Sequence, residues 1–386
     1  MARRLNRISA VMQKEMLHIF RDNIAFMIAF LAPILLGALV SFLYVEQKVT
    51  GIPVAVYDQD QSETSRLIIR SFADSERFKI TRVCNSYAEV EHLLQSEKVQ
   101  MGIMIPPHLQ KDIKAGVSSE VGLVFNSTNL LTMNTLANAA SAVVQTISAG
   151  ITMKVMQGYG VAPQKAYQAV TALNFRTRYW YNPTLSYLVF MVLGLFGTVL
   201  QQVTFLGVAL SFSREKENGT WRQLACSKLR TAEIIGGKLS VYFIIYSINA
   251  LILYGAGFSY FGLPMRGNVF LFLGTVLLFI FVLLAMGMAI SIVAASTPQA
   301  IEISMLIAVP SFLISGWTWP LASMPWPLQF LSRLLPLSYF LEAIRRIAFL
   351  GAGLEVVWPE ILVLFLMAAV CIPLTGFVLN RQLTGD

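Results

Sequence analysis

The sequence predicts an α-helical polytopic membrane protein with six transmembrane helices and an inserted extracytoplasmic α/β domain. Apolar residues make up 56% of the chain and charged residues only 13%, whereas soluble domains carry about 25% charged residues. Several uncharged runs are as long as the roughly 20 residues that a helix needs to cross a bilayer. Between the first two of these runs, charges return and short strand and helix signals alternate.

Composition and residue spacing exclude several other classes. The formal net charge is +8, which in a soluble chain would suggest nucleic acid. In a membrane protein, topology and anionic lipid explain such a charge better, so we expect lipid and no nucleic acid as partner. Cys84, Cys226 and Cys371 have neither zinc nor redox spacing, and the three histidines are scattered. We therefore expect no metal site.

Residues 1–23 are expected to form an amphipathic helix in the inner membrane interface. Apolar side chains recur at helical spacing: Ile8, Val11, Met12, Met16, Ile19 and Phe20. Basic side chains take the other face: Arg7, Lys14, His18 and Arg21. This basic side should face the cytoplasm. The alternative is an extended start to the first span.

The first span is predicted at residues 24–45, with a kink at Pro33. It is too long for the apolar part of a signal peptide. Basic residues precede it: Arg3, Arg4, Arg7, Lys14 and Arg21. The N-terminus is therefore expected in the cytoplasm.

Residues 46–180 are predicted to form an α/β domain. Strands are expected at 53–57, 78–83, 100–105 and 121–125, with short helices between them and a long helix from Leu130 to about Gln157. Long domains are translocated largely regardless of their charge, so an extracytoplasmic location is allowed.

Asp58, Asp60 and Glu63 form the one carboxylate cluster of this domain that is a candidate for chemistry. A metal or acid–base role is conceivable, but turn and capping chemistry after a strand is the favoured interpretation. His92 and His108 support no catalytic triad, so the chain is not expected to be an enzyme.

Residues 181–386 contain five more predicted spans, at 184–212, 239–261, 268–295, 299–319 and 361–379. Tyr179, Trp180 and Tyr181 suit an aromatic belt at the entrance of the second span. Six spans place the loop 213–238 and the C-terminus in the cytoplasm. That loop is rich in Lys and Arg, whereas residues 261–267 contain only Arg266, as the positive-inside rule requires.

The loop 213–238 opens with a dense charge cluster, Arg214-Glu215-Lys216-Glu217-Asn218-Gly219-Thr220-Trp221. Gly219 allows a sharp turn. Thr220 is expected to cap a short helix, with Gln223 completing a capping box. Trp221 and Leu224 then lie one turn apart on one face. The prediction is a short helix with an exposed aromatic side chain. The alternative is a solvated positive loop that only fixes orientation.

Glu302 lies inside the fifth predicted span. Acidic groups within the membrane are functional candidates by default. However, Glu302 is about one turn from the predicted cytoplasmic end, where water and a helix N-terminus accommodate a carboxylate. Both interpretations stay open.

Residues 316–357 interrupt an apolar run with prolines and tryptophans, from Gly316-Trp317-Thr318-Trp319-Pro320 through Met324-Pro325-Trp326-Pro327 to Pro336. The pattern predicts re-entrant or interfacial helices on the outer face, since irregular backbone at membrane depth needs a protein or cavity surrounding. The alternative is an ordinary aromatic interfacial loop.

The motif Arg-Glu-x-Glu-x-Gly-Thr at 214–220, followed by Lys228 to Lys238, resembles the permease subunits of type-2 ABC exporters. The resemblance extends over most of the chain. It implies an interfacial connecting helix at the N-terminus and an extracytoplasmic domain after the first span. It also implies a coupling helix that docks on an ATPase subunit, formed by Arg214, Glu215, Glu217, Gly219, Thr220, Trp221 and Leu224. The outer gate would include Gly316, Pro320, Met324, Pro325 and Pro336.

Gly236-Gly237-Lys238-Leu239 is not a phosphate-binding loop, because Lys238 is followed by Leu and the earlier glycine is missing. ATP and Mg are therefore expected on a partner ATPase, with no cofactor in this chain. The expected protein is a permease subunit of the bacterial inner membrane, paired with an identical or related permease. Its substrate would be an amphipathic drug, lipid, glycan or peptide. The alternative is a non-transporting ATP-driven regulator or envelope-assembly factor that binds a periplasmic partner.

Overall fold

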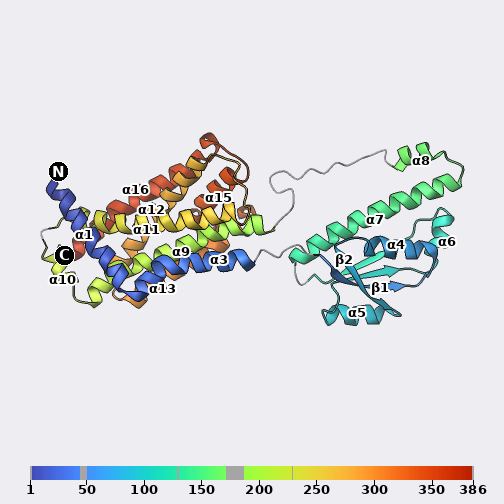
Figure 1. Ribbon diagram of the computed structural model, residues 1–386, viewed down its shortest axis with the longest axis horizontal. Helices are drawn as coiled ribbons and strands as arrows, with labels where there is room; N and C mark the ends of the chain where they lie inside the picture. Colours follow the sequence, from blue (N-terminus) through green and yellow to red (C-terminus); the bar gives the residue numbers. More distant parts are fainter. Residues whose placement is uncertain (1, 44–49, 128–129, 171–186, 228, 385–386) are drawn as a thin grey trace. The chain divides into compact units, whose positions relative to one another are not determined.

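The computed structural model describes residues 2–43, 50–127, 130–170, 187–227 and 229–384 (Figure 1). The chain forms two compact units. Unit 1 comprises residues 1–47 and 178–386, and unit 2 comprises residues 48–177. Tyr179, Trp180 and Tyr181, predicted as an aromatic belt, lie outside the described residues.

Unit 2 is built on a four-stranded sheet with strand order β2-β1-β3-β4. Strand β1 (Ile52–Asp58) pairs in parallel with β2 (Phe78–Cys84) and β3 (Met101–Ile105), and β4 (Gly122–Phe125) is antiparallel to β3. The four strands predicted from the sequence are thus confirmed. Helices α4 (Glu63–Ala73) and α7 (Leu130–Gly158) cover one face of the sheet, and α5 (Tyr87–Gln95) covers the other (Figure 1).

Two further helices complete unit 2: α6 (Leu109–Lys114) and α8 (Pro163–Val170). The carboxylates at the end of β1 serve as turn and loop acceptors. Asp58 Oδ1 accepts the backbone N–H groups of Asp60 and Gln61, and Asp58 Oδ2 accepts the Ser65 hydroxyl at 2.7 Å. Asp60 Oδ2 accepts the backbone N–H of Gln110, 3.1 Å away, at the start of α6. These hydrogen bonds bear out the turn and capping interpretation of the cluster.

Unit 1 begins with α1 (Ala2–Arg21) and a first apolar helix in three pieces. These are α2 (Asn23–Phe26), a π-helical turn η1 (Met27–Leu31) and α3 (Ala32–Leu43). The irregularity lies just before Pro33, which has no N–H to donate to the carbonyl of Ala29. The side-chain amide of Asn249 donates to that carbonyl instead, at 2.6 Å. The proline therefore breaks the regular helix where a neighbouring helix supplies the missing donor.

Five long helices follow in unit 1: α9 (Tyr187–Glu217), α11 (Thr231–Ser259), α12 (Val269–Val293), α13 (Thr297–Ile314) and α16 (Leu354–Thr384). Within the described ranges, seven helices are long and apolar enough to cross a membrane, six in unit 1 and α7 in unit 2. The predicted polytopic helical class is thereby confirmed. The six spans predicted from the sequence are the six of unit 1, because the sequence predicts α7 as part of the α/β domain.

Glycines on α9 let large rings from other segments of unit 1 approach its backbone. A Cβ on Gly207 would lie 1.8 Å from the Tyr246 hydroxyl, and a Cβ on Gly194 would lie 2.4 Å from the Trp317 ring. Tyr246 instead packs on Gly207 and donates its hydroxyl to the Val203 carbonyl at 2.9 Å. Small residues at helix contacts allow such close packing inside a bilayer, where lipid gives helices no hydrophobic reason to associate.

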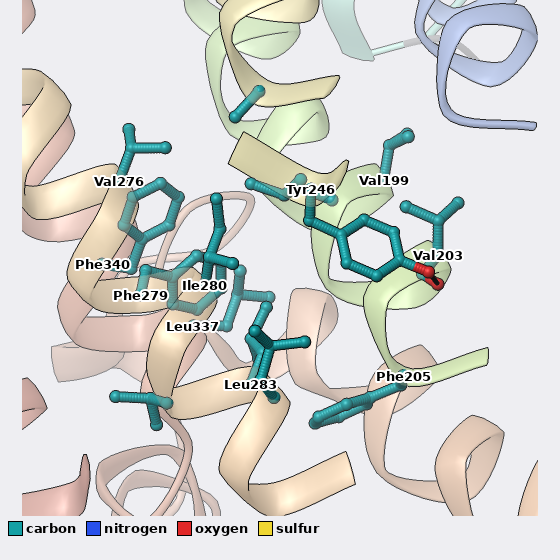
Figure 2. Close-up of a cluster of buried hydrophobic side chains, with 14 of the residues drawn as sticks. Val199, Val203, Phe205, Tyr246, Val276, Phe279, Ile280, Leu283, Leu337 and Phe340 are labelled. Carbon is teal, nitrogen blue, oxygen red and sulfur yellow. Dashed lines mark hydrogen bonds between the residues drawn. The ribbon is translucent and has the colours of Figure 1, made fainter. Parts of the chain in front are cut away.

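One cluster of buried apolar side chains forms the main core of unit 1, and α12 contributes many of them (Figure 2). Phe279 of α12 and Phe340 stack face to face, with ring centroids 3.9 Å apart and planes 2° apart. Phe340 belongs to α15 (Pro336–Ala348), most of whose side chains are buried. Helix α15 is therefore part of the bundle core.

The segment after α13 contains helices, as predicted. It runs through a 3-10 turn η2 (Leu321–Ser323), α14 (Trp326–Arg333) and α15. Helix α13 ends at Ile314, before the predicted end of the span at residue 319. Gly316 follows with a φ of +85°, a conformation that favours glycine and that ends the helix.

The start of α1, the end of α16 and the short helix α10 (Trp221–Ala225) lie at one end of unit 1 (Figure 1). A hydrogen bond between Thr231 and Asn380, 3.2 Å long, joins the start of α11 to the end of α16 there. The last residues of α3 and the first described residues of α9 lie at the opposite end (Figure 1). Unit 2 thus follows α3 and precedes α9 in the sequence, and these two helix ends lie at the same end of unit 1 (Figure 1).

Candidate functional site

The charge cluster predicted as a loop is mostly helical. Helix α9 continues through Arg214, Glu215 and Glu217, and α11 begins at Thr231, so only α10 and its two short connections separate the helices. We call the last turns of α9, with their partners on α1, α11 and the α12–α13 connection, the charged end of unit 1.

The side chains of this cluster are directed at other helices. Arg214 forms an ion pair with Asp22, the N-cap of α2. Lys216 donates to the backbone carbonyls of Ile292 and Ala294 at the end of α12. A cation at a helix C-terminus also interacts favourably with the helix dipole. The charges therefore fasten α9 to the ends of its neighbours.

Glu217 joins the end of α9 to the start of α13. Its two carboxylate oxygens accept the backbone N–H and the hydroxyl of Thr297, at 2.7 and 2.8 Å. A carboxylate that accepts from the first turn of a helix satisfies a donor that the helix itself leaves free. Arg214, Lys216 and Glu217 thus join α9 to α2, α12 and α13.

Glu215 belongs to a buried ion network. Lys238 of α11 lies 2.8 Å from Glu15 of α1 and 3.3 Å from Glu215, and its side chain is 1% exposed. Lys14 lies 2.6 Å from Glu215 on the outer side of the network. Tyr242 donates to Glu15 at 3.0 Å. Buried charges need such partners, because each loses its hydration on folding.

Gly237 allows α1 to approach α11 beside this network. A Cβ on Gly237 would lie 2.7 Å from Val11 and 3.2 Å from the carbonyl oxygen of Ile8. The glycine pair at 236–237, which fails as a phosphate loop, is therefore the place where α1 crosses α11. Arg7 of α1 also lies 3.5 Å from Glu233 of α11.

The sequence analysis missed Glu15, Asp22 and Lys238 as members of the site. One signal was present: Glu15 lies midway between Val11 and Ile19 at helical spacing, and all three are buried. A carboxylate in the apolar stripe of α1 required a buried cation elsewhere, and Lys238 is the one cation of α11, a mostly apolar helix.

The predicted capping box of α10 is wrong. Thr220 has helical backbone angles and makes no side-chain cap hydrogen bond. Its hydroxyl donates instead to the Glu215 carbonyl at the end of α9, at 3.3 Å. Gly219 does supply the predicted turn, with a φ of +71°. Because Gly219 places Thr220 against the end of α9, that hydroxyl satisfies a terminal carbonyl there.

The expectation of an exposed aromatic on α10 is also wrong, since Trp221 is half-buried. Its ring packs edge-on against Phe212, with centroids 6.2 Å apart, and Lys216 Nζ lies 5.3 Å from its centroid. Leu224 is buried beneath α10. The exposed side chains of this segment are Arg222, Gln223, Ala225 and Cys226. Trp221 and Leu224 therefore anchor α10, while Arg222 and Gln223 are exposed on its outer side.

The predicted gate residues do not form one cluster. Two of them lie beside Phe190 in the first turn of α9, at the end of unit 1 opposite α10 (Figure 1). Gly316 and Pro320 line a cavity of about 500 Å³ together with Trp317 and Arg345. The Arg345 guanidinium lies 6.0 Å from the centroid of the Trp317 ring, which is 3% exposed. Three others take structural positions: Met324 is buried after η2, Pro325 precedes α14, and Pro336 begins α15.

Glu302 lies on the exposed surface of α13, in its second turn. Within the part of the chain that the structure describes, its carboxylate has neither a hydrogen bond nor an ion pair. The charged end does not include it.

A family model described as "ABC-2 family transporter protein" matches residues 24–377, from α2 to α16. The chain belongs to the ABC-2 family of transporter permeases. It is accordingly a multi-pass membrane protein and a permease subunit of an ABC-2 type transporter. The resemblance inferred from the motif at 214–220 is confirmed.

Relatives cover nearly the whole chain. The "Probable multidrug ABC transporter permease YbhR" of Escherichia coli K12 is 25% identical over 364 residues, which are 94% of this chain and 95% of the relative. The "Inner membrane transport permease YhhJ" of the same strain is 26% identical over 316 residues, 81% of this chain and 80% of the relative. The "Linearmycin resistance permease protein LnrN" of Bacillus subtilis 168 is 22% identical over 362 residues, 90% and 92% of the two chains. All three are named as permeases.

Proposed function

We propose that this permease exports amphipathic molecules, driven by ATP that a separate cytoplasmic ATPase hydrolyses after docking on α10. The observation that carries the proposal is the set of contacts that the charged end makes with the neighbouring helices. Arg222 and Gln223 of α10 are exposed, while hydrogen bonds and ion pairs of the adjacent residues 214–217 reach α1, α2, α11, α12 and α13. A push on α10 would therefore be transmitted to the ends of several spans together.

The remaining predicted coupling residues fit this arrangement. Glu215 and Arg214 fasten α9 to α1 and α2, Gly219 forms the turn, and Thr220 joins that turn to the end of α9. In this proposal α1 is the interfacial connecting helix. Its buried pair with Lys238 would make α1 move together with α11.

We also propose six membrane spans, with unit 2 outside the cell and both termini in the cytoplasm. The last residues of α3 and the first described residues of α9, between which unit 2 lies in the sequence, are at the same end of unit 1 (Figure 1). A single crossing by α7 would place those two points on opposite sides of the membrane. Packing supports the same assignment, since Leu136 and Ala140 of α7 are fully buried in the core of unit 2.

Cysteine labelling in intact cells tests this topology. Cys226 is exposed, whereas Cys84 is buried, and burial raises the pKa of the Cys84 thiol, which lowers the fraction of reactive thiolate. A cysteine at the exposed position 91 of unit 2 is therefore the better outside reporter. With Cys84 and Cys371 changed to Ser, a membrane-impermeant maleimide should label a Glu91→Cys chain in intact cells. It should label Cys226 only after permeabilisation. The opposite pattern would refute the topology.

The names of two relatives refer to multidrug transport and to linearmycin resistance, which supports a drug-like cargo. The permease names of the relatives do not favour the alternative of a non-transporting regulator. ABC-2 permeases act in pairs, so we propose an identical or related second permease. Gly316, Pro320 and the cavity beside Trp317 are proposed to lie near the outer exit. We also propose that unit 2 binds a partner in the periplasm.

Replacing Trp221 with Ala is expected to abolish coupled ATP hydrolysis and transport together, while the chain still inserts. The change removes the ring that holds α10 on Phe212 and Lys216. Truncating a buried aromatic costs about 3–5 kcal/mol; for the half-buried ring of Trp221 we expect a smaller, local loss that loosens α10. Substrate-stimulated ATPase activity and efflux, measured in proteoliposomes with the cognate ATPase, should fall together by at least tenfold.

A matched control is Trp326→Ala on α14, where the ring is 78% exposed. It should retain coupling. Charge reversal in Glu217→Lys should behave like Trp221→Ala, because it removes both acceptors from the start of α13. Normal coupling in both Trp221→Ala and Glu217→Lys would refute the role of α10.

A further inference from the structure

Unit 2 contains two adjoining cavities that the coupling proposal does not use. The first, of about 450 Å³, lies between α4, α6, α7 and the loop after α6. The second, of about 680 Å³, lies along the same three helices. Both volumes fall within the roughly 300–1,000 Å³ typical of small-molecule sites. Ile113, Ile151 and Val155 line both cavities, so the two form one groove, which we call the α7 groove.

The first cavity is mainly apolar. Its walls include Val144, Ile147, Ile151 and Val155 of α7, and Leu109 and Ile113 of α6. The apolar stripe of α7 begins at Leu136 and Ala140, which are buried against the sheet. Ile151 and Val155 continue the stripe but belong to no buried cluster among the described residues. The apolar stripe of α7 thus extends beyond the part of the helix that packs against the sheet.

The second cavity is rimmed by four cations: Arg66 and Arg70 of α4, Lys114 of α6 and Lys154 of α7. Glu63 is the one carboxylate that lines it. All ion pairs between described residues lie in unit 1, so none of these four cations has a carboxylate partner. Four cations on three helices around one cleft repel each other, and an anion would relieve that repulsion.

We propose that the α7 groove binds a single-chain amphiphile with an anionic head group. The hydrocarbon chain would lie against Ile147, Ile151 and Val155, and the head group would contact Arg70, Lys114 and Lys154. Apolar surface next to unpaired cations matches this ligand in both of its parts, whereas a neutral lipid would leave the cations unpaired. Binding at the groove involves residues of unit 2 alone and requires no ATP, so it can be measured separately from transport.

Photo-crosslinking of the full chain tests the proposal. The chain would be placed in phosphatidylcholine nanodiscs and titrated with palmitate that carries a diazirine in its chain, and the labelled peptides would be mapped by mass spectrometry. We expect saturable labelling of residues 109–121 and 144–159. The double variant Arg70→Gln/Lys154→Gln should raise the half-saturating concentration about tenfold, since two charge contacts are lost.

The matched control neutralises two cations of the same unit outside the groove, in Lys79→Gln/Arg82→Gln on the exposed strand β2. It should label like the wild-type chain. All four positions are exposed, so thermal unfolding should be the same in both double variants. A diazirine hexadecanol probe, which lacks the charge, should label the groove at least tenfold more weakly.

Three results would overturn the proposal. They are equal labelling of the groove by the alcohol and the carboxylate, equal half-saturation in the two double variants, and labelling confined to the helices of unit 1. The first would leave an apolar groove without selectivity for charge. The second would place the anion elsewhere.

Discussion

Replacing Lys238 with Met is expected to lower the free energy of unfolding by about 3–5 kcal/mol, because it leaves buried carboxylates without their cation. Glu15 and Glu215 are 2% and 6% exposed, and Lys238 contacts both. The loss should appear as a lower apparent melting temperature of the purified chain in detergent, and as release of α1 to proteolysis.

The matched control is Lys14→Met, the same substitution on the same network. The Lys14 side chain is 50% exposed, and exposed ion pairs contribute about 0–1 kcal/mol. Its effect should therefore be several-fold smaller. The triple variant Glu15→Gln/Lys238→Met/Glu215→Gln should recover much of the lost stability, since it removes the unpaired charges as well. If Lys238→Met were as stable as Lys14→Met, the buried network would not hold α1 in place.

Replacing Gly237 with Ala is expected to destabilise the packing of α1 on α11, whereas Gly236→Ala is expected to be neutral or stabilising. At Gly237 the new Cβ would lie 2.7 Å from Val11, and at Gly236 nothing lies within 4 Å. Overpacking costs about 1–3 kcal/mol, while an open Gly→Ala change inside a helix gains up to about 1 kcal/mol.

The two adjacent variants share composition, helix and chemistry, so the difference between their melting temperatures isolates the contact with α1. Gly237→Ala should also weaken transport coupling, because it displaces α1 from Glu215 and Lys238. Equal melting temperatures for the two variants would mean that α1 does not pack on α11 at this point.

The sequence predicted correctly those elements whose ends are determined by residues nearby in the chain. The strands of unit 2 are bounded by turn residues, and α12 follows its N-cap Asn268, whose side chain accepts two N–H groups of the first turn. The ends of α9 and α11 were placed less well. Their charges predicted a solvated loop, but Arg214 and Glu215 are satisfied by tertiary partners, which no sequence window contains.

The geometry of the candidate site likewise depends on residues that are far apart in the sequence. The motif at 214–220 located the region from sequence and led to the correct family. Its geometry was not available from the motif, because Glu15, Glu215 and Lys238 meet only when α1, α9 and α11 pack together. The surface that α10 presents also followed from packing, since Trp221 and Leu224 turn inward and expose Arg222 and Gln223.

The most direct test of the central claim is purification of the chain from its native membrane in mild detergent, with mass spectrometry of the proteins that accompany it. The account predicts a stoichiometric soluble ATPase that binds the wild-type chain and the control Trp326→Ala, and that is lost from Arg222→Glu and Trp221→Ala. An ATPase retained by all four chains, or none under conditions that preserve other transporter complexes, would contradict docking on α10.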